Sequence, residues 1–493
     1  MKQQAGALLS SIRIERGSDR KISVQLYMAL REIILTGGLG AGRRLPASRT
    51  LAKEIGVSRT TVIDAIDRLV SEGMLVSRVG AGTYVSDVLA QPLTGADRPD
   101  APQDVLAEPI LSQRFSVALD NFAPRQRLPH KSQAFITALP ALEAFPMAHW
   151  ARISARHLRG NRDEIMGYGP PQGLDRLRRS IASHLNAARG IKCRPEQIFI
   201  TGGAQQAFSI LGRVLLNSGD RVWYENPGAI GAGNALVANG AQLVPVPVDG
   251  DGLDVEQGLQ FAPDFRLAFV TPSHQQPLGH VMSLQRRLAL LDAARAANAM
   301  IVEDDYDGEF HFSERVQPAL KSIDTQDRVI YVGTFSKTLF PSIRLGFILS
   351  PDSLVPVFDR VFTSWISGPS TATQAVVSDF MDEGQFATHI RMMRRLYKAR
   401  YDVLMQAAQA LPPSIKIQPT RSGFHTTAYL DPRVDTARLV AQAAERNVIT
   451  APLSRYCLAP VEQNALVLGF GSAKPDDIQS GLKLLSGLPA LDI

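Results

Sequence analysis

The stretch "VIYVGTFSKTLFPSIRLGFILS", residues 329–350, decides how the larger part of this chain folds. The apolar run from Val329 to Val332 predicts a buried strand, and small hydroxylated residues follow it in a turn. Lys337 ends that turn, and Arg344 comes seven positions later. A buried lysine near a cation has a lowered pKa, which favours imine formation with an aldehyde. Hydroxyls and a fixed arginine beside it suit a dianionic phosphate, so the stretch predicts a site for a phosphorylated aldehyde.

Strand-like apolar runs alternate with helical segments around this stretch. "EQIFITGG" (196–203) precedes the helical "AQQAFSILGRVLL" (204–216), and "MIVEDDYDG" (300–308) is another strand with a polar end. Such alternation predicts an α/β fold with a mainly parallel sheet. Ligands of these sheets bind at the carboxyl ends of the strands.

Polar or glycine-rich residues follow four of the predicted strands. A glycine turn that opens a helix favours a phosphate, because free N–H groups and the helix dipole point at it. A carboxylate after a strand can hold a protonated ring nitrogen, and a phenol can contact a ring oxygen. Each feature alone is more often a turn, a helix cap or a structural histidine, but together with the lysine they predict one site. Its candidate residues are Gly203, Ala204, Gln205, His274, Gln276, Asp304, Tyr306, Thr334, Ser336, Lys337 and Arg344.

These elements resemble the fold-type I enzymes that depend on pyridoxal 5'-phosphate (PLP), the class I aminotransferase group, over about residues 130–475. The resemblance implies that Lys337 forms a Schiff base with PLP, that Asp304 contacts the ring nitrogen and that Tyr306 contacts the ring hydroxyl. It assigns the phosphate to Ala204, Gln205, Thr334, Ser336 and Arg344.

A further segment, "YGPPQGLDRLRRSIASHL" (168–185), matches the same enzymes. In them the residue at Tyr168 reaches the phosphate of the partner subunit. The resemblance therefore implies a homodimer with shared sites, and we expect it to be domain-swapped.

The first 87 residues differ from the rest in charge. They contain 13 Lys and Arg against 8 Asp and Glu, which is +5 of the net +6 of the whole chain. A basic small domain attached to a near-neutral large one indicates a polyanionic partner for the first part.

This basic part has the spacing of a helix-turn-helix followed by a hairpin. Residues 23–36 have helical apolar spacing, and Ser48 is expected to cap a helix over 49–55. Gly56 would turn the chain into a second helix over 59–73, capped by Ser58. The segments "MLVSRV" (74–79) and "TYVSD" (83–87) predict two short strands that form a wing. A polar helix face with ordinary caps is the simpler alternative, but it leaves the basic excess and the wing unexplained.

The stretch also resembles the winged helix-turn-helix domain of GntR-type bacterial regulators over residues 12–87. It carries "LP" at 45–46, "GVSR" at 56–59, "TV" at 61–62 and "GT" at 82–83. The polar start of the second helix and this resemblance imply an α+β DNA-binding domain. The expected DNA contacts are Arg44, Arg49, Ser58, Arg59, Thr60, Thr61, Gly82 and Thr83.

Length and composition agree with a multidomain globular chain. With 493 residues, 45% hydrophobic and 20% charged, we expect a winged-helix domain at 12–87, a linker at 88–115 and the aminotransferase-like domain at 116–493. The later half of that linker is equally compatible with a loop packed on the second domain. Two cysteines give no disulfide framework or metal spacing, and no run of about 18 apolar residues occurs. We expect a cytoplasmic protein with no membrane partner and no metal.

The predicted site departs from the aminotransferase pattern in its substrate half. Active aminotransferases carry an arginine near the C-terminus that holds the substrate carboxylate, and Val467 stands at the matching place. A valine cannot form that bidentate clamp. Ala229 and Gly231 stand where many relatives have an aromatic and a second basic residue, and Arg455 and Arg421 are candidate anion contacts.

A winged helix joined to an aminotransferase-like domain resembles the MocR subgroup of GntR regulators, whose known members respond to PLP, GABA, taurine or other amino compounds. We therefore expect a transcriptional regulator that binds a double-stranded DNA operator as a homodimer. PLP at Lys337, or an amine condensed onto it, would control it, with at most a weak transaminase half-reaction. An active aminotransferase with an appended DNA-binding domain, and a regulator with an empty second domain, stay open.

Overall fold

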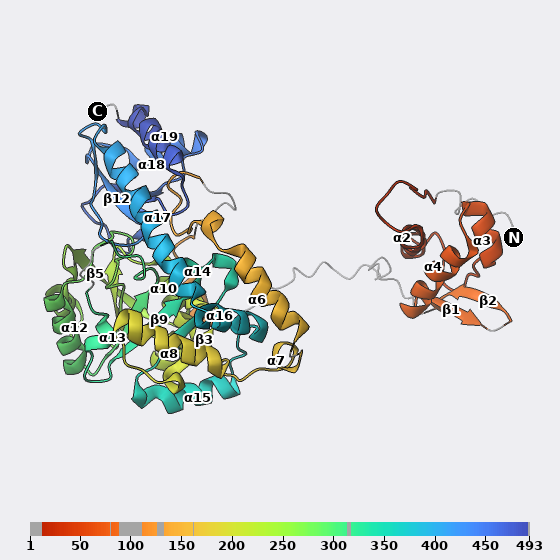
Figure 1. Cartoon of the computed structure of the whole chain (residues 1–493), viewed down its shortest axis with the longest axis horizontal. Coiled ribbons are helices and arrows are strands. Elements are labelled where there is room, and N and C mark those ends of the chain that lie inside the picture. The colour runs from red at the N-terminus through yellow and green to blue at the C-terminus, as the bar shows by residue number, and fades with distance from the viewer. Residues whose placement is uncertain are drawn as a thin grey trace, which may run out of the picture. The chain divides into compact units, whose positions relative to one another are not determined.

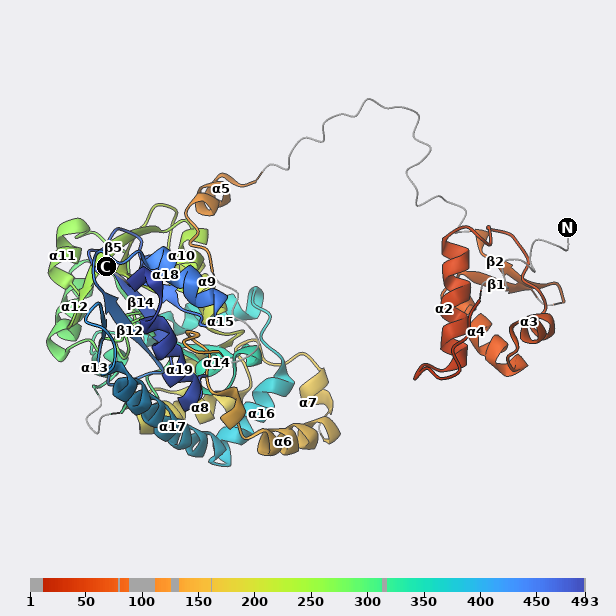
Figure 2. The ribbon, with the colours of Figure 1, turned by 90° about the horizontal axis from the view of Figure 1, so that it is seen from above.

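The computed structural model of this chain divides into two compact units, residues 1–110 and 111–493. It describes residues 12–78, 80–87, 111–125, 133–160, 162–312 and 317–491. Most of the predicted linker, residues 88–110, lies outside the described residues. Figures 1 and 2 show the elements of each unit from two directions. None of the helices described is both long and apolar enough to cross a membrane.

The described residues of the first unit form three helices and a hairpin around one apolar core, which is the predicted winged helix-turn-helix. Leu26, Leu30 and Ile34 of the first helix are buried there, together with Leu51 and Leu69. The elements are α2 (Ile22–Leu35), α3 (Ser48–Ile55), α4 (Arg59–Ser71), β1 (Leu75–Arg78) and β2 (Gly82–Val85). β1 and β2 pair antiparallel and form the wing.

The turn between α3 and α4 follows from two residues. Gly56 ends α3 with a φ of 73°, a left-handed conformation that costs glycine little. Ser58 precedes α4, and its hydroxyl accepts a hydrogen bond from the N–H of Thr61 at 3.1 Å. The expectation that Ser48 caps α3 is wrong, because the helix already begins at Ser48. Ala47 therefore stands at the cap position and offers no side-chain acceptor.

An eight-stranded sheet forms the centre of the second unit, in the order β3-β10-β9-β8-β7-β4-β5-β6. The strands from β9 to β5 run parallel, as the α/β pattern predicts. β10 is antiparallel to both of its neighbours, and β6 is antiparallel to β5, so the sheet is mixed. The strands are β3 (Ile198–Thr201), β4 (Arg221–Asn226), β5 (Gln242–Asp249), β6 (Gly252–Leu253), β7 (Leu267–Val270), β8 (Met300–Asp305), β9 (Val329–Thr334) and β10 (Gly346–Leu349).

Helices cover both faces of this sheet, because successive strand residues point to opposite sides. Phe199 of β3 packs in one apolar cluster with α9, α10 and α15, whereas its neighbours Ile198 and Ile200 pack in another with α8 and α16. The helices are α5 (Gln113–Asp120), α6 (Met147–Arg159), α7 (Arg162–Met166), α8 (Asp175–Arg189), α9 (Ala204–Leu215), α10 (Ile230–Ala238), α11 (Val255–Phe261), α12 (Leu284–Ala296), α13 (Leu320–Ile323), α14 (Phe335–Thr338), α15 (Val355–Ser364), α16 (Thr371–Asp382), α17 (Gln385–Ala408), α18 (Thr436–Glu445) and α19 (Pro475–Ser486).

A smaller antiparallel sheet, in the order β11-β12-β14-β13, completes the second unit. The long helix α17 runs from this sheet to α16 (Figure 1). β12 and β14 are neighbours. His425 at the start of β12 and Val467 in the middle of β14 line the same cavity as Lys337. The strands are β11 (Ile415–Ile417), β12 (His425–Leu430), β13 (Ala451–Pro452) and β14 (Ala465–Gly469).

The helix α5 begins inside the segment predicted as linker. The hydroxyl of Ser112 accepts a hydrogen bond from the N–H of Phe115 at 3.3 Å and so caps the helix. Residues 113–115 are therefore helical, and the expectation of an extended chain is wrong for them.

Candidate functional site

A cavity of about 370 Å³ lies where the central strands of the second unit end. Segments after β3, β7, β8 and β9 line it together with the turn before β10. Ten of the predicted site residues line this cavity, which brings the four strand ends together. They are Gly203, Ala204, Gln205, Gln276, Asp304, Tyr306, Thr334, Ser336, Lys337 and Arg344. Two predicted residues are elsewhere: His274 lies behind the wall, and Tyr168 is fully exposed to solvent.

Lys337 lies on the short helix α14 directly after β9. The hydroxyl of Thr334 caps α14 by accepting a hydrogen bond from the N–H of Ser336 at 3.2 Å. The half-buried lysine donates from Nζ to the carbonyl of Ala138 at 2.6 Å. Burial first, and then the charge of Arg125, lower its pKa to about 8, although nearby carboxylates act in the opposite direction. A lysine amine in this setting loses its proton readily and becomes nucleophilic.

Asp304 is a buried carboxylate that lacks a full set of partners. Its Oδ1 has no hydrogen-bond partner among the residues that the structure describes. Burial, with Asp305 and Asp307 nearby, raises the pKa of Asp304 well above its ordinary value. A buried acceptor of this kind costs free energy unless a donor reaches it. A ligand whose ring N–H enters the cavity would supply that donor, so the residue fits a protonated pyridine ring.

The start of α9 lines the cavity. Gly203 stands at the N-cap of α9 with a φ of 95°. Ala204 and Gln205 begin the helix, so their N–H groups have no acceptor within it. A Cβ atom on Gly346 would lie 3.1 Å from Gly203, which shows how closely β10 approaches this turn. Arg344, two residues before β10, adopts a left-handed backbone with a φ of 48°. The helix start and a guanidinium in one cavity suit a phosphate group.

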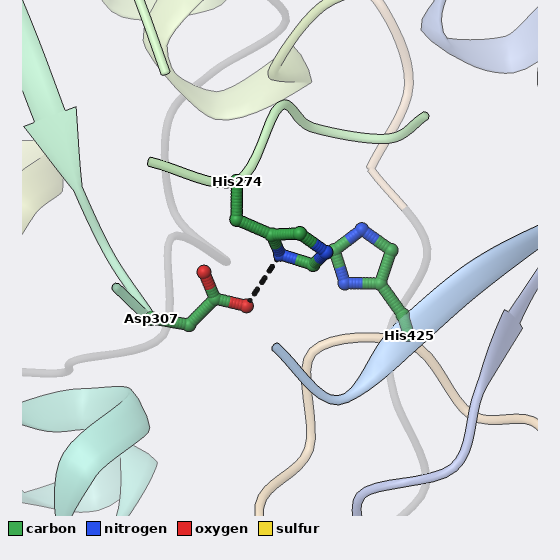
Figure 3. Close-up of side chains that lie close together, drawn as sticks. All are labelled: His274, Asp307 and His425. Atoms are coloured by element: carbon green, nitrogen blue, oxygen red, sulfur yellow. Dashed lines mark hydrogen bonds and ion pairs between the residues drawn. The ribbon is translucent and has the colours of Figure 1, made fainter. Parts of the chain in front are cut away.

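His274, Asp307 and His425 lie close together beside the cavity (Figure 3), and His274 contacts Tyr306. The Tyr306 hydroxyl donates to the carbonyl of His274 at 2.9 Å. Nδ1 of His274 shares a 2.8 Å hydrogen bond with Oδ2 of Asp307, and the rings of His274 and His425 are 4.5 Å apart. His274, Asp307 and His425 each place one possible metal-ligand atom within 4.8 Å of the others, but Nδ1 of His274 and Oδ2 of Asp307 are hydrogen-bonded to each other. His274, predicted as a direct cofactor contact, is instead committed to Asp307 and Tyr306.

His425 and Arg125 are among the cavity residues that the sequence reasoning did not name. His425, at the start of β12, lines the cavity, and its Nε2 has no partner in the described part of the chain. Burial, and then the charges of His274 and Lys337, hold the pKa of His425 well below its usual range, so it is neutral. Arg125 lines the cavity as well and donates to Oε1 of Gln205 at 3.0 Å. Neither follows a predicted strand, and the only local signals at these positions are "SGFH" at 422–425 and the basic run "RQR" at 125–127, which the sequence analysis did not use.

The cavity is apolar at Val467, the position that the sequence analysis compared with the arginine of active aminotransferases. Val467, in the middle of β14, lines it. Arg455 lines the same cavity and donates to the carbonyl of Pro124 at 3.2 Å, whereas Arg421 does not reach it. A Cβ atom on Gly231 would lie 2.8 Å from Oε1 of Gln205, so a side chain at this position needs Gln205 to move.

The predicted DNA contacts lie on the surface of the first unit. Arg44, Arg49, Ser58, Arg59 and Thr60 are exposed, and Thr61, Gly82 and Thr83 are half-buried. The hydroxyls of Ser58 and Thr61 lie 2.8 Å apart because both belong to the cap of α4. The guanidinium of Arg44 lies against Gly82 of the wing, where an added Cβ atom would come within 2.7 Å. The basic side chains thus surround the start of α4 and the wing.

Comparisons with known families and proteins match this two-unit arrangement. Residues 22–85 match the family of bacterial regulatory proteins called gntR, and residues 139–465 match the aminotransferase class I and II family. The probable rhizopine catabolism regulatory protein MocR of Rhizobium meliloti is 40% identical over 96% of this chain and 94% of its own length. The pyridoxine biosynthesis transcriptional regulator PdxR of Corynebacterium glutamicum is 29% identical over 95% of this chain and 96% of its own length.

Solved structures match the second unit. The kynurenine aminotransferase of Pyrococcus horikoshii has 28% sequence identity and a TM-score of 0.67, covering 72% of this chain and 90% of its own. An archaeal alanine:glyoxylate aminotransferase gives 26% identity and a TM-score of 0.68 over 72% of this chain and 90% of its own.

Proposed function

This chain belongs to the MocR group of GntR-family transcriptional regulators, and we propose on that premise that PLP held at Lys337 controls how it acts on DNA. The observation that carries the proposal is one cavity in which Lys337, Asp304 and Arg344 meet an apolar Val467. Lys337, Asp304 and Arg344 provide an amine, a carboxylate and a cation for PLP. Val467 stands where active aminotransferases have the arginine that binds the substrate carboxylate.

Each part of the cavity would hold a different part of PLP. Lys337 would bind the aldehyde carbon, because the lowered pKa of its amine makes the neutral form available. Asp304 would accept the hydrogen bond of the ring N–H, and Tyr306 would lie beside the ring hydroxyl. The start of α9, with Thr334, Ser336 and Arg344, would bind the phosphate. When bound, PLP supplies an aldehyde that condenses with primary amines.

The signal would be PLP itself or a primary amine condensed onto it. With Val467 in the wall, a carboxylate has no partner on β14, so binding of an α-amino acid loses its usual orientation. Arg125 and Arg455 are the cations that remain to hold a carboxylate or sulfonate, as in GABA or taurine. The relatives concerned with rhizopine catabolism and with pyridoxine biosynthesis are compatible with either kind of signal.

DNA binding would come from the first unit of each subunit in a homodimer. Arg59 and its neighbours at the start of α4 would enter the major groove, while the wing would contact the backbone. Tyr168 is fully exposed in the single chain, which supports its assignment to the cavity of a partner subunit. The dimer, domain-swapped as expected from the sequence, would read repeated half-sites in the cytoplasm.

The test compares full-length protein with and without PLP on DNA from the region upstream of its own gene. PLP should change the DNA affinity or the footprint of the wild-type protein and leave Lys337→Ala unaffected. Lys416→Ala, which changes an exposed lysine on β11, should behave as wild type. An equal response of Lys337→Ala and the wild type would overturn the proposal.

An active aminotransferase with an added DNA-binding unit is the second candidate. The intact cofactor half of the cavity and the 28% identity to the kynurenine aminotransferase favour it. Amino donors and acceptors added to the PLP-loaded protein discriminate between the two. Steady turnover well above that of free PLP supports the enzyme, and a single half-reaction without turnover supports the sensor.

A further inference from the structure

A second cavity of about 530 Å³ lies in the second unit, separate from the first. Among the described residues that line it are three arginines and one carboxylate, so cationic side chains outnumber acidic ones there. The charged or titratable residues that line it are Arg189, Asp251, His280, Arg287, His311 and Arg421.

Arg287 is a fully buried cation without an acidic partner. Its Nε donates to the carbonyl of Met282 at 3.0 Å, and its Nη2 donates to the carbonyl of Pro272 at 2.8 Å. Its Nη1 has no hydrogen-bond partner among the described residues, and none of their carboxylates forms an ion pair with it. Since arginine stays protonated in proteins, this side chain keeps a positive charge inside the fold, which Glu303 and Asp305 oppose electrostatically without contacting it as ion pairs.

Two more donors in the same wall lack partners. Arg189 forms a buried ion pair with Asp305 at 2.5 Å and donates to the hydroxyl of Ser273 at 2.8 Å, yet its Nε is unsatisfied. The buried hydroxyl of Ser422 also has no partner within the described ranges. Buried donors are satisfied in most folded proteins, so three unsatisfied donors around one cavity indicate a missing acceptor.

The two cavities share one wall of three chain segments. Residues 273–279, 304–308 and 421–425 each contribute lining residues to both cavities, although 304–308 reaches the second cavity only through Gly308. The His274–Asp307 pair lies within this wall, and a Cβ atom on Gly423 would come within 2.1 Å of the His274 ring. Such close packing leaves little freedom for one segment to move without the others.

We propose that the second cavity is a binding site for a small metabolite that carries a phosphate or carboxylate group, and that its occupancy is transmitted through the shared wall to the cavity of Lys337. The anion would neutralise the charge of Arg287 and accept from the unsatisfied donors. A shift of Arg189 would act on Asp305, which adjoins Asp304 in the chain. The anion site stands without the proposed function, whereas the coupling rests on it.

Titration of cofactor-free full-length protein with inorganic phosphate tests the anion site by calorimetry. Two classes of phosphate site are expected. Arg344→Gln should weaken the class in the first cavity and leave the class in the second cavity intact. Arg421→Gln should weaken the second class at least tenfold. Arg438→Gln, an exposed arginine on α18, is the matched control.

A second pair of variants keeps the test independent of Arg421. Gly250 lines the cavity, and a Cβ atom there meets no atom within 4 Å, so a side chain fits. Gly250→Glu should abolish the second class of phosphate sites by charge repulsion, whereas Gly250→Gln should retain it. If phosphate binds only where Arg344→Gln weakens it, the anion site is overturned.

The coupling has its own measurement. In the PLP-loaded protein the first cavity is filled, and the phosphate affinity of the second should differ at least threefold from that of the cofactor-free protein. Equal affinities in both forms would refute the coupling and leave the anion site standing. Succinate titrated in parallel shows whether the site prefers a planar carboxylate to a tetrahedral oxyanion.

Discussion

The pKa of Lys337 predicts how fast the cofactor-free protein captures PLP at each pH. Burial first, and then the charge of Arg125, lower that pKa from 10.5 to about 8. Only the neutral amine attacks an aldehyde, so at pH 7 about one-tenth of the Lys337 side chains are reactive, against about 0.03% for an ordinary lysine. The lowered pKa makes the neutral form dominant above about pH 8 and scarce below it. The capture rate constant should rise about tenfold between about pH 7 and 9 and then level off.

The assay mixes cofactor-free full-length protein with PLP between about pH 7 and 10 and follows the visible absorbance of the bound cofactor. Arg125→Gln removes a cation that lowers the lysine pKa, so the inflection should move to higher pH. Arg438→Gln, on the exposed face of α18, should leave the inflection in place. A rate constant that still climbs tenfold per pH unit above pH 9 would refute the depressed pKa. Capture by Lys337→Ala at the wild-type rate would refute the assignment of this lysine.

Four further outcomes are expected. Asp304→Asn should weaken PLP binding about 10- to 100-fold in equilibrium dialysis, because a charge-assisted hydrogen bond to the ring is lost. The same substitution should not lower the melting temperature of the cofactor-free protein. Arg59→Gln should weaken operator binding and reduce the slope of log K against log salt by about one, as measured by fluorescence anisotropy at several salt concentrations; an unchanged slope would remove this arginine from the interface. Ser58→Ala should destabilise the first unit by about 1 kcal/mol in a denaturant titration, because the N–H of Thr61 loses its acceptor. Leu30→Ala should cost the same unit about 2 to 5 kcal/mol and abolish DNA binding, while PLP absorbance in the second unit is retained.

The sequence predicted those features that depend on local patterns. Helix caps, the turn at Gly56 and the apolar spacing in α2 are local, and they yielded the winged helix correctly. The order of Asp304, Tyr306 and Lys337 along the chain identified the strand ends that meet in the cavity. The cap predicted at Ser48 was wrong by one residue, because α3 begins at Ser48 itself.

Features that depend on distant segments escaped prediction. The antiparallel insertion of β10 between β3 and β9 has no periodicity that distinguishes it from a parallel strand. His425 reaches the cavity only because β12 closes its side, and Arg125 lies in a segment without strand or helix. The second cavity combines residues from across the second unit, and no motif joins Arg189, Arg287 and Arg421.

The position of β10 also sets an order of events during synthesis. The described residues of the first unit end at Asp87 and enclose a core of their own, so this unit can fold while most of the chain is still unmade. The cavity of Lys337 cannot begin to form until Leu349 has emerged, because β10 must first enter between β3 and β9, and it is completed only when β12 and β14 follow. Each new chain is therefore expected to pass through an interval in which the first unit is folded but the cavity of Lys337 is not. A message that ends before Gly346 would make that interval permanent and yield a DNA-binding fragment that competes with the full-length regulator.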